Sequence, residues 1–261
     1  MIRSIFLDID GTLVSFKTHE IPPSTIEALT LAKANGVGIY ISTGRPLPII
    51  TNLGAIKHLI DGYITTNGAM CIIGGNAVYC NPIPQADIDA IVTDSRKFDY
   101  ACLIAGERDV VLMNPKEVFN DVFVKQLNVT NIDTSLTLAS LAGQRILQFS
   151  PFIDAAHEQA LMQQMPHCVS GRWHPAFTDI TSREADKGNG LVRMAAHLGL
   201  DISETMAFGD GGNDIPIIRR AGIGVAMGNA GKDVKDAADF VTTDVDDDGI
   251  RNALLHYGII G

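Results

Sequence analysis

Ile5-Phe6-Leu7-Asp8-Ile9-Asp10-Gly11-Thr12-Leu13 is the stretch of sequence that decides the fold. The apolar run at its start predicts a buried strand of a parallel sheet, and two carboxylates and a glycine follow that run. Open α/β sheets bind their ligands at the carboxyl ends of such strands. The sequence therefore predicts a ligand site directly after this first strand.

Asp8 and Asp10 would point to the same face of a strand that continued through them. Gly11 then permits a sharp turn and a close approach of the backbone. Two carboxylates a few ångströms apart repel each other unless a cation or a proton lies between them, which favours a hard divalent metal such as Mg²⁺. One carboxylate could attack a substrate while the other transfers protons. The same residues could also form only an acidic turn, so this stretch alone leaves both interpretations open.

The composition limits the classes of partner. The chain has 261 residues, enough for one large domain or two unequal ones. Its net charge is −10, and no basic block is longer than Arg219-Arg220, so nucleic acid and anionic membrane are not expected as partners. A phosphorylated substrate is compatible with this charge, because a bound Mg²⁺ and one or two basic side chains would set the local sign.

Export and membrane insertion are not expected either. The first strand begins too close to Met1 to leave room for the apolar core of a signal peptide. The uncharged segment 62–86 is interrupted by glycine, asparagine and proline, so it should not span a membrane. The four cysteines show no C-x-x-C spacing and are expected to be thiols in a reducing cytoplasm. We therefore expect a cytoplasmic protein.

Strands and helices alternate in the first part of the chain. Ser24-Thr25-Ile26-Glu27 has the spacing of a capping box and predicts a helix that runs to Asn35, and the apolar run 37–41 predicts the next strand. A helix between two such strands forms a right-handed βαβ unit, which would place Thr43-Gly44 at the same sheet edge as Asp8. The elements predicted next are a helix over 46–58, a strand over 63–66 and a hairpin over 69–80.

The pattern changes between residues 83 and 182. Helices and alternating strands are mixed there, which predicts an α+β insert of about a hundred residues with its own small core. Regular alternation resumes at Lys187, which opens a predicted helix, and continues to the end of the chain. We therefore predict an α/β fold with a Rossmann-like doubly wound parallel-sheet core formed by 1–82 and 183–261. The helices predicted in the insert cover 86–97, 116–128, 135–142 and 154–165, and its strands cover 100–105, 109–114, 145–150, 168–173 and 177–181.

Four segments of the chain carry polar residues where strands end or helices begin. Together they supply a nucleophile, an acid/base, carboxylates for a metal, and donors and a cation for phosphate oxygens, which is what phosphoryl transfer needs. Each segment alone could be an ordinary turn. The four are Asp8 with Asp10, Thr43-Gly44-Arg45, Lys187, and Asp210-Gly211-Gly212-Asn213-Asp214.

With these motifs the sequence resembles the haloacid dehalogenase-like phosphatases, and among them the Cof-type sugar-phosphate phosphatases, which carry a large insert between the second and third motifs. The resemblance covers the whole chain, and its two specific parts are 7–13 and 209–214. It implies that 83–182 form an α+β cap domain, a lid over the leaving group. Asn67-Gly68 also fits the family, whereas 181–186 lack the proline and glycine that often precede the lysine.

The resemblance also implies a role for each matching residue. Asp8 would be the nucleophile that forms an aspartyl phosphate, and Asp10 would be the acid/base. Mg²⁺ would bind the Asp8 carboxylate, the Asp10 carbonyl and the Asp210 carboxylate. The remaining matches are Thr43, Gly44 and Lys187 as phosphate-binding residues, Asn213 and Asp214 as residues that orient Lys187, the phosphate or a metal-bound water, and Arg45 as a residue that contacts the substrate.

These inferences predict a Mg²⁺-dependent phosphatase of small phosphorylated metabolites, with hexose or pentose phosphates as substrates and a monomer or weak homo-oligomer as the working form. A phosphomutase on the same scaffold is the alternative. A phospho-accepting signalling module is disfavoured, because receiver domains are shorter, lack so large an insert and have no use for a proton carrier at Asp10. Release of inorganic phosphate without a bisphosphate activator would separate the phosphatase from the mutase.

Overall fold

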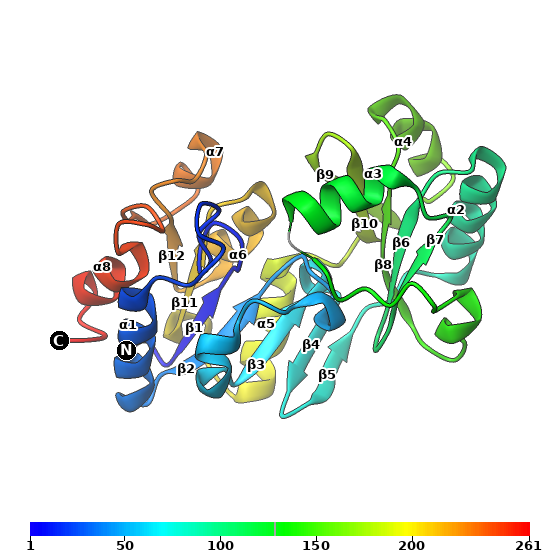
Figure 1. Cartoon of the computed structure of the whole chain (residues 1–261). Coiled ribbons are helices and arrows are strands. Elements are labelled where there is room, and N and C mark those ends of the chain that lie inside the picture. The colour runs from blue at the N-terminus through cyan, green and yellow to red at the C-terminus, as the bar shows by residue number, and fades with distance from the viewer. Residues whose placement is uncertain (128) are drawn as a thin grey trace. The chain divides into compact units, whose positions relative to one another are not determined.

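The computed structural model describes residues 1–127 and 129–261, which form two compact units (Figure 1). Unit 1 comprises Met1–Gly44, Asn52–Cys80 and Asp186–Gly261, and unit 2 comprises Arg45–Thr51 and Asn81–Ala185. The chain passes between the units after Cys80 and after Ala185, a few residues from the predicted ends of the insert, and also on either side of 45–51, a segment that was predicted to belong to the core. That each part folds as an independent domain stays a prediction.

An eight-stranded sheet forms the centre of unit 1, in the order β13-β12-β11-β1-β2-β3-β4-β5. Neighbouring strands are parallel from β13 to β3, whereas β4 and β5 form the predicted hairpin and pair antiparallel. The central strand β1 pairs with both β2 and β11, so its carboxyl end has a neighbour on each side. The strands are β1 (Ser4–Leu7), β2 (Gly38–Ser42), β3 (Gly62–Thr65), β4 (Met70–Ile73), β5 (Asn76–Cys80), β11 (Thr205–Gly209), β12 (Ile223–Ala226) and β13 (Phe240–Val241).

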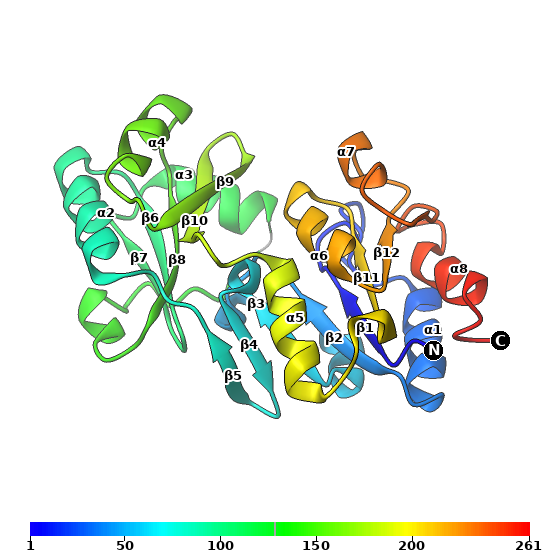
Figure 2. The same cartoon turned by 180° about the vertical axis from the view of Figure 1, so that it is seen from behind.

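Helices cover both faces of this sheet (Figures 1 and 2). α5 (Lys187–Leu198) and α6 (Ile215–Arg220) pack on the face that carries Phe6. α1 (Pro23–Ala34) and α8 (Gly249–His256) pack together on the opposite face. The predicted doubly wound α/β fold is therefore confirmed. The shorter elements of unit 1 are α7 (Lys232–Lys235), η2 (Gly54–Leu59), η3 (Thr66–Gly68), η6 (Ile202–Glu204) and η7 (Gly212–Asp214).

Unit 2 contains a five-stranded antiparallel sheet in the order β7-β6-β8-β10-β9. Alternate residues of these strands face two different apolar clusters. Ile104 and Phe149 pack with α2 (Gln85–Phe98) and α4 (Ala155–Met162) on one face, and Leu103 packs with a group of phenylalanines on the other. The other elements are β6 (Cys102–Gly106), β7 (Val110–Met113), β8 (Ile146–Pro151), β9 (Cys168–His174), β10 (Phe177–Ser182), α3 (Glu117–Phe119), η1 (Leu47–Ile49), η4 (Asn120–Gln126) and η5 (Leu138–Leu141).

Two predicted helices are shorter and of another type in the structure. The segment 46–58 forms the 3₁₀ helices η1 and η2 rather than one α-helix. The backbone becomes extended at Ile50, and the chain passes from unit 2 to unit 1 between Thr51 and Asn52, so the two 3₁₀ helices lie in different units. The helix predicted over 135–142 is reduced to the single 3₁₀ turn η5. The helix predicted over 116–128 is present as α3 and the π-helix η4, and its last predicted residue, Asn128, lies outside the described residues.

The predicted capping box at the start of α1 is wrong. α1 begins at Pro23 with Pro22 as its N-cap, and no side chain caps it. Ser24 is therefore already inside the first turn, where its hydroxyl does not occupy the capping position, and its Oγ is buried without a hydrogen-bond partner. Proline at the first helical position has a preorganised φ and needs no N–H partner, which explains why the helix begins there.

Candidate active site

Three segments of unit 1 bring buried charged side chains together at the carboxyl end of its sheet. Asp8 follows β1 and Asp210 follows the adjacent strand β11, so parallel pairing places both at one edge. Lys187 is the first residue of α5, and Asp214 is the last residue of η7. Because Lys187 is completely buried, its ammonium group needs partners inside the protein.

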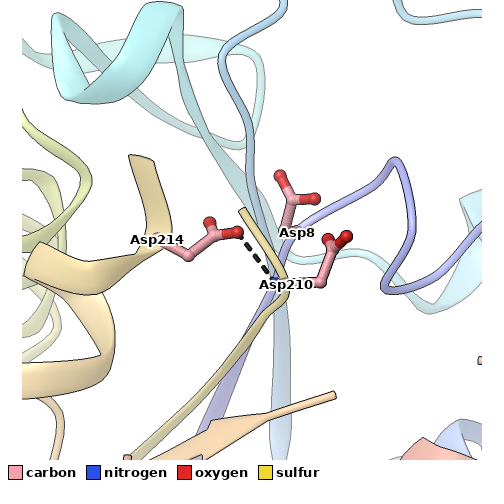
Figure 3. Close-up of side chains that lie close together, drawn as sticks. All are labelled: Asp8, Asp210 and Asp214. Atoms are coloured by element: carbon pink, nitrogen blue, oxygen red, sulfur yellow. Dashed lines mark hydrogen bonds between the residues drawn. The ribbon is translucent and has the colours of Figure 1, made fainter. Parts of the chain in front are cut away.

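Lys187 finds those partners in two carboxylates. Its Nζ donates to Oδ1 of Asp8 and to Oδ1 of Asp214, both at 2.6 Å. Oδ2 of Asp214 accepts the backbone N–H group of Asp210 at 3.1 Å (Figure 3). The same oxygen accepts the backbone N–H group of Gly211 at 3.0 Å. Asp214 therefore uses both oxygens to connect the turn after β11 to Lys187, and Lys187 holds one oxygen of Asp8 in a fixed position.

Asp210 is held from the opposite side. Its Oδ1 accepts the hydroxyl of Thr12 at 3.1 Å, and its Oδ2 accepts Nδ2 of Asn229 at 3.3 Å. Nδ2 of Asn229 also donates to the carbonyl of Gly11 at 2.8 Å. Gly11 has φ +88°, and a Cβ there would lie 2.2 Å from Oδ2 of Asp210. Only glycine allows the loop after β1 to come this close to the carboxylate.

The carboxylates of this cluster carry more negative charge than one ammonium group balances. Burial and the neighbouring Asp214 hold the pKa of Asp8 well above its usual value, against the opposing effect of Lys187. Burial and Asp214 also raise the pKa of Asp210 to about 7. Burial alone would lower the pKa of Lys187, but Asp214 and Asp8 outweigh it and leave that pKa raised. Asp10 lies close enough to raise the pKa values of Asp8 and Asp210 further.

This cluster fits a divalent cation. Asp8, Asp210 and Asp214 each offer a carboxylate oxygen, and these oxygens lie within 4.8 Å of one another (Figure 3). Oxygen donors with unbalanced negative charge are the ligands that Mg²⁺ prefers. Asp214 accepts three hydrogen bonds, one of them from the ammonium group of Lys187, whereas Asp210 accepts two, both from neutral donors, and Asp8 accepts Lys187 through Oδ1, so Asp8 and Asp210 are the better candidate ligands. The predicted metal role of these two residues therefore stays a prediction with which the structure agrees.

The predicted phosphate-binding segment after β2 is joined to Asn213 by a residue of the next loop. Thr43 is buried, and its carbonyl accepts the N–H of Asn67 at 3.1 Å. Oδ1 of Asn67 accepts Nδ2 of Asn213 at 3.0 Å, and a Cβ on Gly44 would lie 3.0 Å from the same oxygen. Asn67 is held in this place by a left-handed turn, with φ +50° at Thr66 and +51° at Asn67.

The remaining predicted site residues are placed as follows. Asp10 is half-buried and forms an isolated bridge with Val14 in the loop after β1. Arg45 belongs to unit 2, so its predicted contact with the substrate stays a prediction. No role was predicted from the sequence for Thr12 or Asn229, which hold Asp210, and none for Asn67 beyond its fit to the family. Asn67 and Asn229 each follow a parallel strand, so the rule that found Asp8 and Asp210 could have found them as well.

Together these contacts provide a carboxylate held beside a buried cation and next to further oxygen ligands. Such a carboxylate can attack an electrophile, while the cation attracts the oxygens of an anionic group.

In the described residues no helix is both long and apolar enough to cross a membrane.

Comparison with known proteins gives similar sequences and structures over the full length. The haloacid dehalogenase-like hydrolase family matches residues 5–254. A Bacillus subtilis relative named "Putative phosphatase YkrA" is 30% identical over 264 residues, which covers 99% of this chain and 98% of the relative. The solved structure of a subclass IIB sugar phosphatase of the HAD superfamily has a TM-score of 0.90 and 45% identity, over 99% of this chain and 100% of that one. A HAD phosphatase from Bacteroides thetaiotaomicron has a TM-score of 0.88 and 34% identity, over 100% and 96% of the two chains.

Proposed function

Because the chain belongs to the haloacid dehalogenase-like hydrolase family, we propose that it is a phosphatase of small phosphorylated metabolites that works through an aspartyl phosphate on Asp8. The family predicted from the sequence is thereby confirmed, and the chain is a hydrolase. The proposal goes further, since it names the bond that is hydrolysed, the nucleophile and the cofactor, Mg²⁺.

The buried cluster of Asp8, Lys187 and Asp214 is the observation that carries the proposal. Lys187 fixes one oxygen of Asp8 at 2.6 Å, which restricts the carboxylate to one orientation for attack on phosphorus. The same ammonium group lies beside the nucleophile, where it can attract the phosphate oxygens and stabilise charge in the transition state. Asp214 is hydrogen-bonded through both oxygens, so it keeps Lys187 in place as the substrate arrives.

Two further residues complete the proposed chemistry. Asp10 is half-buried rather than enclosed, so its carboxyl group can give a proton to the leaving oxygen and later take one from water. Asp210 is held by Thr12 and Asn229 with its charge directed toward Asp8, which suits it to share a cation with the nucleophile. When bound, Mg²⁺ would neutralise repulsion between the Asp8 carboxylate and the phosphate.

Sugar phosphates are the substrate class we propose. The support is the similarity to the subclass IIB sugar phosphatase, which extends over essentially the whole of both chains at 45% identity. Both units of this protein therefore have a counterpart there. Hexose and pentose phosphates remain the specific expectation from the sequence, together with a cytoplasmic location and a monomeric or weakly associating form.

The direct test is a screen of the purified protein against phosphorylated metabolites with Mg²⁺, with release of inorganic phosphate as the readout. Asp10→Asn should let the aspartyl phosphate accumulate when an aryl phosphate is supplied, because its leaving group needs little protonation whereas hydrolysis of the intermediate still lacks its base. Mass spectrometry of the peptide that contains Asp8 should then find the added phosphoryl group. Asp99→Asn, an exposed aspartate of unit 2 in the left-handed conformation that asparagine tolerates, is the matched control and should behave as wild type. Absence of phosphate release from every compound in the screen would overturn the proposal.

A further inference from the structure

Three consecutive residues after β3 have left-handed backbone conformations. The φ angles are +50° at Thr66, +51° at Asn67 and +94° at Gly68. Asparagine and glycine adopt such conformations readily, but a β-branched threonine does not, so the backbone is strained at Thr66. The Oγ1 of Thr66 is also buried and has no hydrogen-bond partner in the described part of the chain. This turn therefore costs stability, and strain of this kind occurs mainly at sites of function.

The turn brings a single polar side chain to the surface. From Ile64 to Ile72 every residue is buried except Asn67, which is half-buried. Because the turn follows β3, Asn67 lies at the carboxyl end of the parallel strands, the edge at which Asp8 follows β1. The strained turn thus places the amide of Asn67 at the edge of the sheet where ligands bind.

Three residues predicted to bind the phosphate or to orient its ligands touch this turn, and all of them belong to unit 1. Oδ1 of Asn67 accepts Nδ2 of Asn213 at 3.0 Å. A Cβ on Gly44 would lie 3.0 Å from Oδ1 and 3.3 Å from Nδ2 of Asn67, so the amide lies against the backbone of Gly44. A Cβ on Gly68 would lie 3.2 Å from the backbone nitrogen of Lys187. Asn67 therefore lies among the groups expected to surround the phosphate.

The two ends of the Asn67 amide differ in what they contact. The oxygen is occupied by Asn213, and the backbone N–H of Asn67 donates to the carbonyl of Thr43 at 3.1 Å. The NH₂ group donates to no residue that the structure describes. A donor that is fixed at its other end is preorganised for an acceptor brought by a ligand. A cation is a poor ligand here, because the only oxygen of the amide is already in use.

We propose that Asn67 is a further phosphate-binding residue, whose NH₂ group donates to an oxygen of the phosphoryl group. A neutral donor suits this position, since it stabilises an anion without adding to the charge of the buried cluster. That the bound anion is the phosphoryl group of a substrate ester rests on the proposed function. Affinity for inorganic phosphate requires no turnover, so the two can fail separately.

The first experiment measures the binding of inorganic phosphate to the full-length protein by isothermal titration calorimetry in buffer with Mg²⁺. Asn67→Gly should weaken binding about tenfold, because one hydrogen bond to a charged group is lost. Asn67→Asp should weaken binding more than Asn67→Gly does, because a carboxylate replaces the donor and repels the anion. Both variants should keep the fold, since glycine and aspartate tolerate the left-handed conformation.

The order of the two variants separates this role from a purely positioning one. Aspartate keeps the oxygen that accepts Nδ2 of Asn213, so a residue that only positions Asn213 would tolerate Asn67→Asp better than Asn67→Gly. Asn67→Asp binding phosphate more tightly than Asn67→Gly, or Asn67→Gly binding it as wild type does, would therefore overturn the proposal. Absence of saturable phosphate binding by wild type would overturn it too. If Asn67→Asp does not fold, the affinity of Asn67→Gly decides alone.

Asn76→Asp is the matched control for the added charge. Asn76 is exposed in the β4–β5 hairpin, whose turn lies at the opposite end of β3, because Ile73 pairs with Gly62 and Met70 pairs with Thr65. This variant should bind phosphate as wild type does. A loss equal to that of Asn67→Asp would show that net charge alone weakens binding, and it would overturn the proposal.

The second experiment compares acetyl phosphate with phenyl phosphate, which differ in the leaving group and share the phosphoryl group. Asn67→Gly should lower kcat/KM for both by the same factor, because the contact is made to the part they share. A different factor for the two substrates would contradict a contact with the phosphoryl group. If phosphate binding depends on Asn67 as expected but no phosphate ester is hydrolysed, the role of Asn67 stands and the proposed function fails.

Discussion

Asp214→Asn should destabilise unit 1 by about 3 kcal/mol, although the substitution hardly changes the shape of the side chain. Asp214 is 1% exposed and accepts three hydrogen bonds, one from Lys187 and two from backbone N–H groups. An amide has only one accepting side. Whichever way it turns, its NH₂ group faces either the ammonium of Lys187 or the two backbone donors, so buried donors remain unpaired.

A second effect of this substitution has the opposite sign. Asp214 raises the pKa values of Asp8 and Asp210, so its removal relieves repulsion between carboxylates. Loss of one partner from a buried ion pair costs about 3–5 kcal/mol, and we expect this relief to offset only part of it. At about 2–4 °C per kcal/mol for a protein of this size, a net loss near 3 kcal/mol lowers Tm by about 6–12 °C.

Thermal unfolding followed by circular dichroism in metal-free buffer measures this shift, with Asp99→Asn as the control that should melt as wild type does. A Tm that stays within about 2 °C of wild type, or that rises, would refute the reasoning. It would mean that repulsion among the carboxylates, rather than the anchoring of Lys187, dominates the energetics of the cluster.

The remaining predictions concern the nucleophile, the metal, the loop after β1 and the pH. Asp8→Asn should lower kcat by several powers of ten while the circular dichroism spectrum stays unchanged, and retention of more than about a tenth of the activity would contradict the assignment. Asp210→Asn should shift the Mg²⁺ concentration for half-maximal activity upward, with partial recovery at high Mg²⁺, and an unchanged Mg²⁺ dependence would place the metal elsewhere. Gly11→Ala should cost both stability and activity, because its Cβ would lie 2.2 Å from Oδ2 of Asp210 at a positive φ, and a wild-type Tm would show that the loop can move away. Burial raises the pKa of Asp210 to about 7 in the folded protein, above an unfolded value near 3.9. The folded state therefore binds the Asp210 proton more tightly, so this contribution to the free energy of unfolding is complete below pH ~4 and is lost as pH rises through 7. Metal-free protein should therefore lose stability across that range, as denaturant titrations at several pH values would measure, and a rise in stability would contradict the sign.

The sequence predicted the central elements well because their signals are local. The apolar run before Asp8 and the one before Asp210 each fill a buried parallel strand, and each ends directly before a residue of the proposed site. The parallel pairing of β1 and β11 then follows from the alternation of strands and helices between them. Asp8, Asp210 and Lys187 could therefore be placed near one another before any coordinates were known.

The errors occurred where local signals compete. At 46–58 the apolar spacing favours one helix, but the chain passes from unit 2 to unit 1 between Thr51 and Asn52 and forms a separate 3₁₀ helix on each side. At 24–27 the capping pattern is present, but the helix begins at Pro23 instead. In this second case the backbone preference of proline for the first helical position overrides a pattern of side chains.

The residues missed in the site depend on contacts distant in sequence. Asn229 bonds to Gly11, more than two hundred positions away, and Thr12 bonds to Asp210 across a similar separation. The residues next to Asn229 and Thr12 in the sequence give no sign of either contact. Asn67 is different, because its left-handed conformation suits asparagine, and its position after a parallel strand was visible.

The position of β1 in the middle of the sheet has a consequence for the order in which the protein can be made. The ribosome delivers Asp8 long before β11, the second neighbour of β1, because β11 begins at Thr205 and the whole of unit 2 is synthesised between them. Until then one edge of β1 has no strand to pair with, and Asp214, which anchors Lys187, has not been made. A nascent chain that stops before β11 therefore carries the proposed nucleophile without a completed sheet around β1 and without the anchor of Lys187, so incomplete products of translation should be unable to attack the phosphate esters around them.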